Sequence, residues 1–326
     1  MKIFAQEAII YYNIIIDEHK ERVFLVPYKD KWSLPYWETK QPPYWQDVAS
    51  VNQMMKHKFA MNVTTLRCVT ITYNSETRCQ QRFYELENHD LISKPALGRW
   101  TKRQDLSAFI IPEQYDMVMK SFRDMYTMSV QRKPWTRKGW FDTAVSWIDK
   151  QAVHLGFQVI QPVEQMRIWE RGCVMKIHTS LGILYFKALP PMFAHEIPLT
   201  IAMSKLHSQH FVELLAIEHE QNWMLMIDIG NRSLHTFSEL ELWKDTLRTY
   251  ARLQIASVAY TDELVSLGCH NRCSEKIHAE VDSFLASLST TYPHISDTVV
   301  EHVKGLSHQL KTECDLLSHC RIPSNN

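Results

Sequence analysis

The fold of this chain is decided by the stretch from Val174 to Leu234, which holds three apolar runs: Val174-Met-Lys-Ile-His178, Ile183-Leu-Tyr-Phe-Lys-Ala-Leu189 and Trp223-Met-Leu-Met-Ile-Asp-Ile-Gly230. Ser180-Leu-Gly182 separates the first two runs, and such a turn between apolar segments predicts a hairpin. A short helix around Glu196 is expected next. The third run predicts a buried strand that ends in a turn.

Lys187 is the unusual residue of this stretch, because it lies within an apolar run between Phe186 and Ala188. Burying a lysine costs free energy unless an anion meets its charge. The sequence offers two such partners, the carboxylate of Glu196 and the phosphates of a nucleotide. A lysine that is simply exposed at a strand edge is the plainer alternative.

These runs resemble the small lobe of the protein-kinase-like fold, in the aminoglycoside phosphotransferase branch. Tyr185-Phe-Lys-Ala188 is similar to the lysine strand of that family, and Phe193-Ala-His-Glu-Ile-Pro-Leu-Thr200 is similar to the start of its glutamate helix. In the family, the lysine holds the nucleotide phosphates and pairs with the glutamate. The resemblance therefore implies that Lys187 binds phosphates and that Glu196 holds the lysine.

The resemblance also implies an adenine site and an activity. The run from Trp223 to Gly230 is similar to the strand that leads to the adenine hinge, so the backbone at Ile227 and Ile229 is expected to contact the base. Trp169-Glu-Arg-Gly172 would form the loop over the phosphates, and amphipathic helices beyond Ser238 would begin a helical large lobe. The implied cofactors are ATP and magnesium, and the implied partner is a small-molecule substrate that accepts phosphate on a hydroxyl.

Phosphoryl transfer itself is not expected from this chain alone. The family places His-Gly-Asp and a later asparagine after an Ile-Pro, and here the sequence reads Cys320-Arg-Ile-Pro-Ser-Asn-Asn326 and ends. We therefore assign no catalytic residue and expect either a truncated protein or a fragment of a longer one. A non-catalytic nucleotide- or small-molecule-binding regulatory module is the alternative function.

Before residue 133 the sequence predicts strands at 8–16, 23–28, 63–73 and 80–87, and helices at 47–59 and 113–125. The first two strands are expected to pair as a hairpin, and Asp47 is expected to cap the first helix. With Leu34-Pro35 before that helix, this order resembles the Nudix fold. An unrelated small α/β domain is the alternative.

The Nudix helix carries metal-binding glutamates, and the corresponding positions here hold Asn52, Gln53, Lys56 and His57. Magnesium needs clustered carboxylates, so we expect a degenerate Nudix-like scaffold without Nudix hydrolysis. An active Nudix hydrolase is the weaker alternative.

The expected fold class is α+β, with a Nudix-like α/β domain at 1–132 and an aminoglycoside-phosphotransferase-like domain at 133–326. The second domain would hold a protein-kinase-like small lobe and the first helices of the large lobe. Arg132-Lys-Pro-Trp-Thr-Arg-Lys-Gly139 marks the boundary, because a basic run with proline and glycine is typical of a solvated connector. A helix at 141–155, a stop at Gly156 and a strand at 163–168 are expected next.

Composition restricts the partners. The 36 basic and 36 acidic residues give a formal charge of +0, so neither nucleic acid nor an anionic membrane is expected as a partner. We find no run of membrane-spanning length and no signal peptide, and the seven scattered cysteines favour a cytoplasmic location. No metal site is assigned, since free cysteines are favoured over a zinc site at Cys269, His270, Cys273 and His278. The acceptor and the oligomeric state are not specified.

Overall fold

A computed structural model describes residues 8–17, 19, 21–40, 43–74, 79–90, 97–126, 132–230, 233–291 and 295–319. The internal contacts divide the chain into two compact units, and the boundary in the sequence lies between Ile229 and Gly230. The boundary expected at 132/133 falls inside the first unit and stays a prediction. The second unit is described separately below.

The first unit begins with two small sheets. A mixed sheet has the order β4 (Tyr36–Thr39), β1 (Ile9–Ile15), β6 (Cys79–Asn88) and β5 (Val63–Asn74), in which β1 runs parallel to β6. An antiparallel sheet has the order β3 (Lys31–Ser33), β2 (Arg22–Tyr28) and β7 (Arg99–Lys102). The helices of this part are α1 (Ala49–Phe59), α2 (Leu106–Phe109) and α3 (Pro112–Tyr126).

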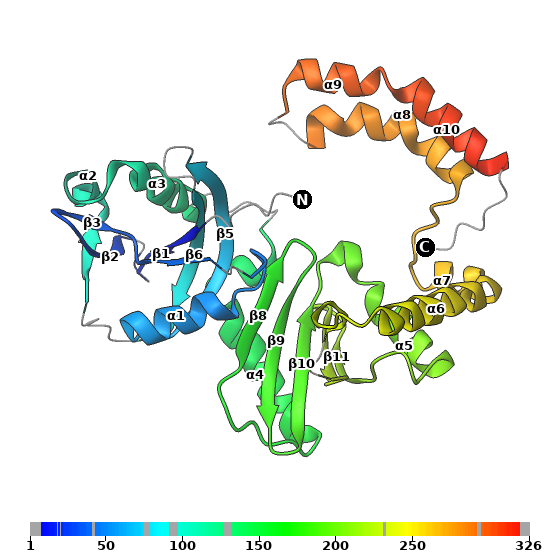
Figure 1. The fold of residues 1–326 in the computed structure, drawn as a ribbon, viewed down its shortest axis with the longest axis horizontal. Helices are drawn as coiled ribbons and strands as arrows, with labels where there is room; N and C mark the ends of the chain where they lie inside the picture. Colours follow the sequence, from blue (N-terminus) through cyan, green and yellow to red (C-terminus); the bar gives the residue numbers. More distant parts are fainter. Residues whose placement is uncertain are drawn as a thin grey trace. The chain divides into compact units, whose positions relative to one another are not determined.

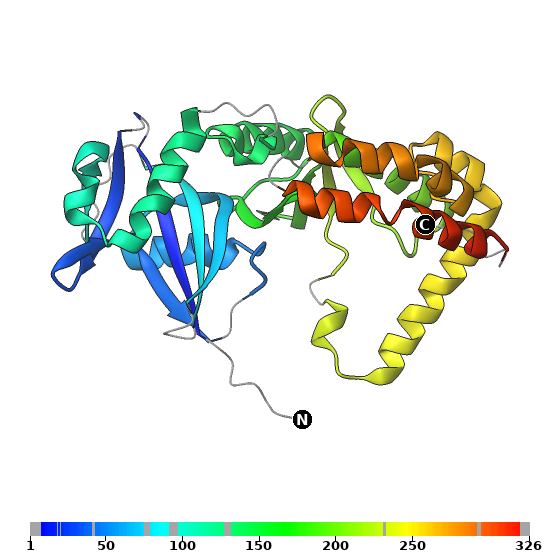
Figure 2. The ribbon, with the colours of Figure 1, turned by 90° about the horizontal axis from the view of Figure 1, so that it is seen from above.

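Strand β1 is buried on both faces because α1 and α3 pack on opposite sides of its sheet (Figures 1 and 2). Tyr11 and Ile15 join the core beneath α1, whereas Ile14 joins the core beneath α3. The predicted hairpin of the first two strands is wrong. Both edges of β1 are taken by β4 and β6, so β2 meets it only at the single bridge between Ile16 and Val23.

A third, antiparallel sheet follows in the same unit. Its order is β11 (Leu214–Glu218), β12 (Trp223–Ile227), β10 (Gly182–Ala188), β9 (Gly172–Thr179) and β8 (Glu164–Trp169). Helix α4 (Trp140–His154) precedes this sheet, and α5 (Glu196–Leu206) connects β10 to β11. Gly156, just after α4, adopts a φ of 79°, which agrees with the predicted helix stop.

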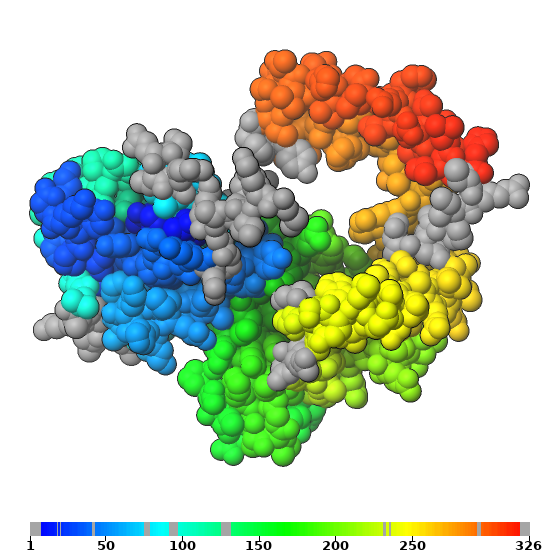
Figure 3. Space-filling view, in the orientation of Figure 1, coloured from blue at the N-terminus to red at the C-terminus, as the bar shows by residue number. Residues whose placement is uncertain are grey.

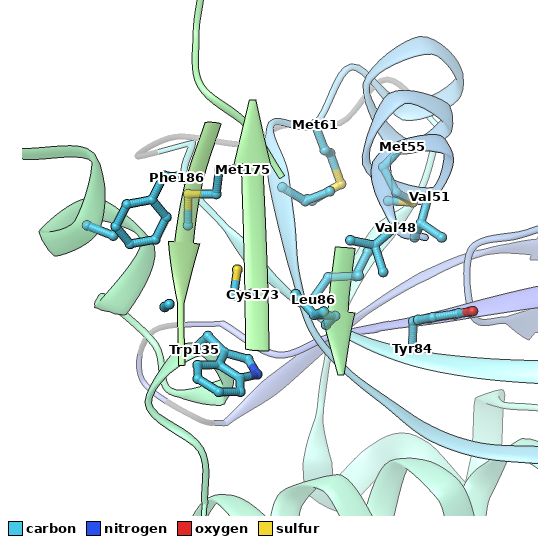
Figure 4. Packing of buried hydrophobic residues seen from close by; sticks show 14 of the residues in the cluster. Val48, Val51, Met55, Met61, Tyr84, Leu86, Trp135, Cys173, Met175 and Phe186 are labelled. Carbon is cyan, nitrogen blue, oxygen red and sulfur yellow. The ribbon is translucent and has the colours of Figure 1, made fainter. Parts of the chain in front are cut away.

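One hydrophobic core joins this sheet to the first part of the unit. It contains Val51 and Met55 of α1, Leu86 of β6, Met175 of β9 and Phe186 of β10 (Figure 4). In the space-filling view the blue surface of α1 continues into the green surface of the third sheet (Figure 3). The two parts therefore share buried apolar area and do not form separate cores.

The segment 132–139 is not a solvated connector, although its sequence predicted one. Trp135 is only 2% exposed and belongs to the shared core. Lys138 Nζ donates to the carbonyl oxygen of Ile16 at 2.7 Å, and Arg132 Nη2 lies 3.4 Å from Glu85 Oε2. Because Trp135 is buried in the core, the segment lies against the protein and its basic residues contact partners there.

The second unit is helical. Its helices are α6 (Leu240–Ser257), α7 (Thr261–Ser266), α8 (Ser274–Thr291), α9 (Asp297–Lys304) and α10 (Ser307–His319). A small core forms where Val281, Leu285 and Leu288 of α8 meet Val300 of α9. In α6, Leu240 and Leu247 are 64% and 60% exposed. Glu239 precedes the helix and makes no side-chain cap.

Candidate functional site

The pleat of β10 gives its two faces different compositions. Leu184, Phe186 and Ala188 are buried, whereas Tyr185 and Lys187 alternate with them and are partly exposed. The buried face packs on α4, where Trp140 and Trp147 contact Phe186 with ring centroids 6.2 and 5.9 Å apart. Since successive side chains of a strand point to opposite faces, Lys187 points away from this aromatic cluster.

Helix α5 covers one end of the opposite face. Ile197 packs against Leu189 and Met224 there, with Ile201 and Leu214 around them. Farther along the same face, the cross-strand neighbours of Tyr185 and Ile183 are Lys176 and His178 of β9, which are partly exposed. The covered and the exposed parts of this face meet at Lys187.

Lys187 Nζ contacts Glu196 Oε1 at this junction. Glu196 is the first residue of α5, where its charge also suits the helix dipole. The lysine side chain is 23% exposed and the glutamate side chain 37% exposed, so the ion pair contributes at most about 1 kcal/mol to stability. Its larger effect is to hold the ammonium group at a fixed place on an accessible face.

The turn between β8 and β9 lies at the same end of the sheet as Lys187. Trp169 pairs with Gly172 across this turn, and Lys187 pairs with Val174 two residues later. A side chain on Gly172 would place its Cβ 2.8 Å from the carbonyl oxygen of Ala188, so only glycine fits at this close approach. The expected phosphate loop is therefore a tight hairpin turn that packs directly on β10.

Arg171 adds a second cation near this end of the sheet. Its guanidinium carbon lies 6.0 Å from the ring centroid of Phe193, just before α5. The sequence analysis did not single out Arg171, since an arginine in a turn carries no signal of its own. Its position follows from the turn and the start of α5, which are more than twenty residues apart in sequence.

Carboxylates lie at the other end of the exposed face. Burial, followed by the negative charges of Asp228 and Glu164, raises the pKa of the Tyr185 hydroxyl above its ordinary value. Glu164 Oε1 also lies 3.3 Å from His178 Nε2. The exposed face therefore places Lys187 near α5, and two carboxylates together with Lys176 around Tyr185.

The predicted hinge residues follow directly from β12. Ile227 pairs with Leu184 and is 37% exposed, and the amide of Asp228 donates to the carbonyl oxygen of Ile183 at 3.1 Å. Ile229 is 79% exposed and is the last residue of the first unit. Their contact with adenine stays a prediction.

The helix predicted to correspond to the Nudix helix presents a different site. Val51 and Met55 of α1 are buried, while Asn52, Gln53 and Lys56 line a cleft of about 600 Å³. The helix begins at Ala49, two residues later than predicted, and Asp47 does not cap it. Asp47 Oδ1 instead accepts a hydrogen bond from Arg167 Nε of β8 at 2.6 Å.

Gln165 of β8 closes the floor of this cleft. Its Oε1 accepts hydrogen bonds from Asn52 Nδ2 at 3.1 Å and from the Thr65 amide at 2.8 Å, and its Nε2 donates to the Thr65 carbonyl at 2.9 Å. Sequence analysis missed Gln165, because its partners lie 100 and 113 residues away along the chain.

Two further predictions concern metals and membranes. Within the described residues, no group of three or more His, Cys, Asp or Glu side chains could hold a metal ion, and this includes Cys269, His270, Cys273 and His278. Among the described helices, none has the length and apolarity needed to cross a bilayer.

Comparison with known proteins gives limited similarity. No family model and no curated protein matches the chain. Among solved structures, it is similar to a Nudix hydrolase from Nitrosomonas europaea, with 14% identity and a TM-score of 0.31 over 37% of this chain and 73% of that one. It is also similar to an ADP-ribose pyrophosphatase from Streptococcus suis, with 16% identity and a TM-score of 0.29 over 37% of this chain and 94% of that one. A Sinorhizobium meliloti protein assigned to the oxidoreductases shares 16% identity with a TM-score of 0.30, over 36% of this chain and only 38% of its own length.

Proposed function

We propose that the exposed face of the third sheet binds a nucleotide of the ATP type, with Lys187 on its phosphates. One observation carries the proposal. An ammonium group on the accessible face of a strand is held by the first residue of the helix that follows, while the neighbouring strand residues are buried. A fixed ammonium group on an accessible face is suited to meet the negative charge of a phosphate.

The surrounding geometry supports the same ligand. Arg171 brings a second positive charge to the turn that approaches β10 most closely. At the other end of β10, Ile227 and Ile229 are 37% and 79% exposed, so an apolar surface is accessible there to a planar base. A nucleotide extended between these two ends would place its phosphates near Lys187, in agreement with the resemblance to the aminoglycoside phosphotransferases.

Magnesium is assigned no ligand of this chain. Glu196 already faces Lys187, and the described residues present no carboxylate cluster of the kind that holds a divalent cation. Phosphoryl transfer to a small-molecule hydroxyl is the activity that the resemblance implies. A regulatory module that binds a nucleotide without transferring phosphate is the rival, and both require the same site.

Titration calorimetry with ATP and with adenosine tests the proposal. We expect ATP to bind with a dissociation constant of about 1 mM, a free energy of about 4 kcal/mol. Lys187→Met should weaken ATP binding at least about tenfold, since it removes the charge that faces the phosphates, and should leave adenosine binding unchanged. Glu196→Gln should weaken ATP binding less, because the ammonium remains but is no longer held in place.

Lys150→Met is the matched control, because Lys150 is an exposed lysine on α4, which packs on the other face of the sheet. It should bind ATP as the unaltered protein does. If the Lys187→Met variant and the unaltered protein bound ATP with equal affinity, Lys187 would be a structural strand residue. The nucleotide site would then lose its main support.

A further inference from the structure

The cleft beside α1 is not used by the proposed nucleotide site. It lies within the first unit, between α1, the start of β5, the end of β6 and the segment that leads into β8, and has a volume of about 600 Å³. This is within the size range of small-molecule sites. All of its lining residues belong to the described part of the chain.

The charges around the cleft do not favour a highly charged ligand. Lys56 is its one lining lysine, while Asp142 and Glu164 supply two carboxylates. Each carboxylate faces a histidine, with His89 Nδ1 at 3.5 Å from Asp142 Oδ1. A nucleoside diphosphate derivative would bring several negative charges against these two carboxylates with a single ammonium to meet them.

Carboxamides are the commonest polar side chains of the lining. Asn52 and Gln165 are locked together at the floor, and Gln53 and Gln161 are exposed at the sides. A carboxamide both donates and accepts hydrogen bonds, as a hydroxyl group does. A ligand with several hydroxyl groups can therefore satisfy these side chains in more than one way.

The cleft also has an apolar wall that suits the C–H face of a sugar ring. Phe141 lines the cleft with its ring tilted against His89 at a centroid distance of 5.4 Å, and Pro162 and Val163 lie in the same lining. Carboxamides, carboxylates and one aromatic ring together match an uncharged ligand that is polar at its edge and apolar on its face.

We propose that this cleft binds a neutral saccharide of one or two rings. The proposal is independent of the nucleotide site, because none of the residues assigned to ATP lines the cleft. Hydrogen bonds from the exposed glutamines to ring hydroxyls, with the ring face against Phe141, account for the composition of the cleft.

Saturation-transfer magnetic resonance on the full chain tests this, with glucose, N-acetylglucosamine and trehalose as probes and ADP-ribose as the charged contrast. We expect transfer to at least one saccharide, and none to ADP-ribose in the Lys187→Met variant, in which the proposed phosphate site is weakened. The double variant Gln53→Ala/Gln161→Ala should lose the saccharide signal at least tenfold. Both glutamines are exposed, so an unchanged thermal unfolding profile should accompany the loss.

Lys58→Ala is the matched control, since Lys58 is exposed on α1 but does not line the cleft. It should keep the saccharide signal. Absence of transfer to all three saccharides, or equal transfer in the double variant and the unaltered protein, would overturn the proposal. Transfer to ADP-ribose but to no saccharide in the Lys187→Met variant would overturn it too and assign the cleft to nucleotides. ATP binding in the double variant should be unchanged, which separates this result from a failure of the Lys187 site.

Discussion

Helix α1 and strand β10 each place a lysine where the sequence resembles a phosphate-processing protein, but the structure surrounds the two lysines differently. Lys56 of α1 is exposed and lines a cleft whose other polar groups are mostly carboxamides. Lys187 of β10 is partly buried and contacts the carboxylate of Glu196. The comparison teaches that a sequence motif does not fix the surroundings of its lysine, since a carboxylate holds Lys187 in place and carboxamides surround Lys56.

The two regions also differ in how far apart in sequence their partners lie. The partner of Lys187 is nine residues away, across one turn and the start of α5. The polar groups of α1 are completed by Gln165, which lies more than a hundred residues away. The first arrangement can be predicted from a sequence motif. The second cannot, because it forms only when the third sheet packs on α1.

The largest effect expected from this comparison concerns Nudix chemistry. We predict that the full chain with Mg²⁺ or Mn²⁺ hydrolyses no nucleoside diphosphate derivative, because Gln53, Lys56 and His57 offer no carboxylate to a metal. Metal-assisted catalysis accelerates such reactions by many orders of magnitude, so the difference from an active site is easily measured. A panel of these substrates, assayed by release of phosphate after phosphatase treatment, gives the measurement.

Turnover that disappears in a Gln53→Ala/Lys56→Ala variant would contradict this prediction, because α1 would then support catalysis without the glutamates of a Nudix helix. Turnover that persists in the variant would indicate a contaminating activity.

Gln165 gives the next largest effect and tests how α1 is held to β8. Gln165 is 4% exposed. The substitution Gln165→Ala removes its hydrogen bonds to the Thr65 amide, to the Thr65 carbonyl and to Asn52. Unsatisfied buried groups cost about 1–3 kcal/mol each, so we expect the free energy of unfolding to fall by about 3 kcal/mol. Urea denaturation followed by tryptophan fluorescence measures it.

Gln161→Ala is the control for this loss, because Gln161 is exposed four residues earlier in the chain. It should change the free energy of unfolding by less than about 0.5 kcal/mol. Equal effects of the two substitutions would show that the contact between β8 and α1 contributes little, and that the two parts are held by apolar packing alone.

Local patterns predicted the strands and helices themselves more successfully than their partners. The runs around Val174 and Lys187 form the expected hairpin, α3 lies where periodicity placed it, and α5 lies where a short helix was expected around Glu196. Pairing was predicted less well, since β1 and β2 belong to different sheets. Strand β7 at Arg99–Lys102 went unpredicted because it is short and polar and gains its place only by pairing with β2.

The same distinction applies to the candidate site. Lys187, Glu196 and the strand before Ile229 were identified because they lie within one stretch of sequence. Gln165 was missed and Arg171 was predicted only as part of a loop, because the packing partner of each is not indicated by a local pattern. The prediction of a solvated segment around Trp135 failed for a related reason. Its basic residues indicated exposure, but its one tryptophan is buried in the core.

The smallest expected effect concerns Glu87, which lies in β6 where the two regions share a core. Its side chain is largely buried, Oε1 accepts a hydrogen bond from the Gly139 amide at 2.7 Å, and Oε2 is buried without a hydrogen-bond partner. Burial raises the pKa of this carboxyl above its ordinary value near 4.5. The Gly139 amide, His89 and Lys138 lower it in part, and Asp142 raises it further.

A raised pKa in the folded chain means that the folded state binds the proton more tightly than the unfolded state does. The contribution of Glu87 to stability is therefore fully present below about pH 4.5, its ordinary value, and is lost as the pH rises through the raised value. Glu87→Gln keeps an oxygen for the Gly139 amide and removes the charge. We expect it to be more stable than the unaltered protein at neutral pH, by less than the loss caused by Gln165→Ala, and to lose this advantage in acid. Urea denaturation of both proteins at several pH values measures the difference. A difference that does not change with pH would mean that Glu87 has an ordinary pKa, and that the unpaired Oε2 is reached by water.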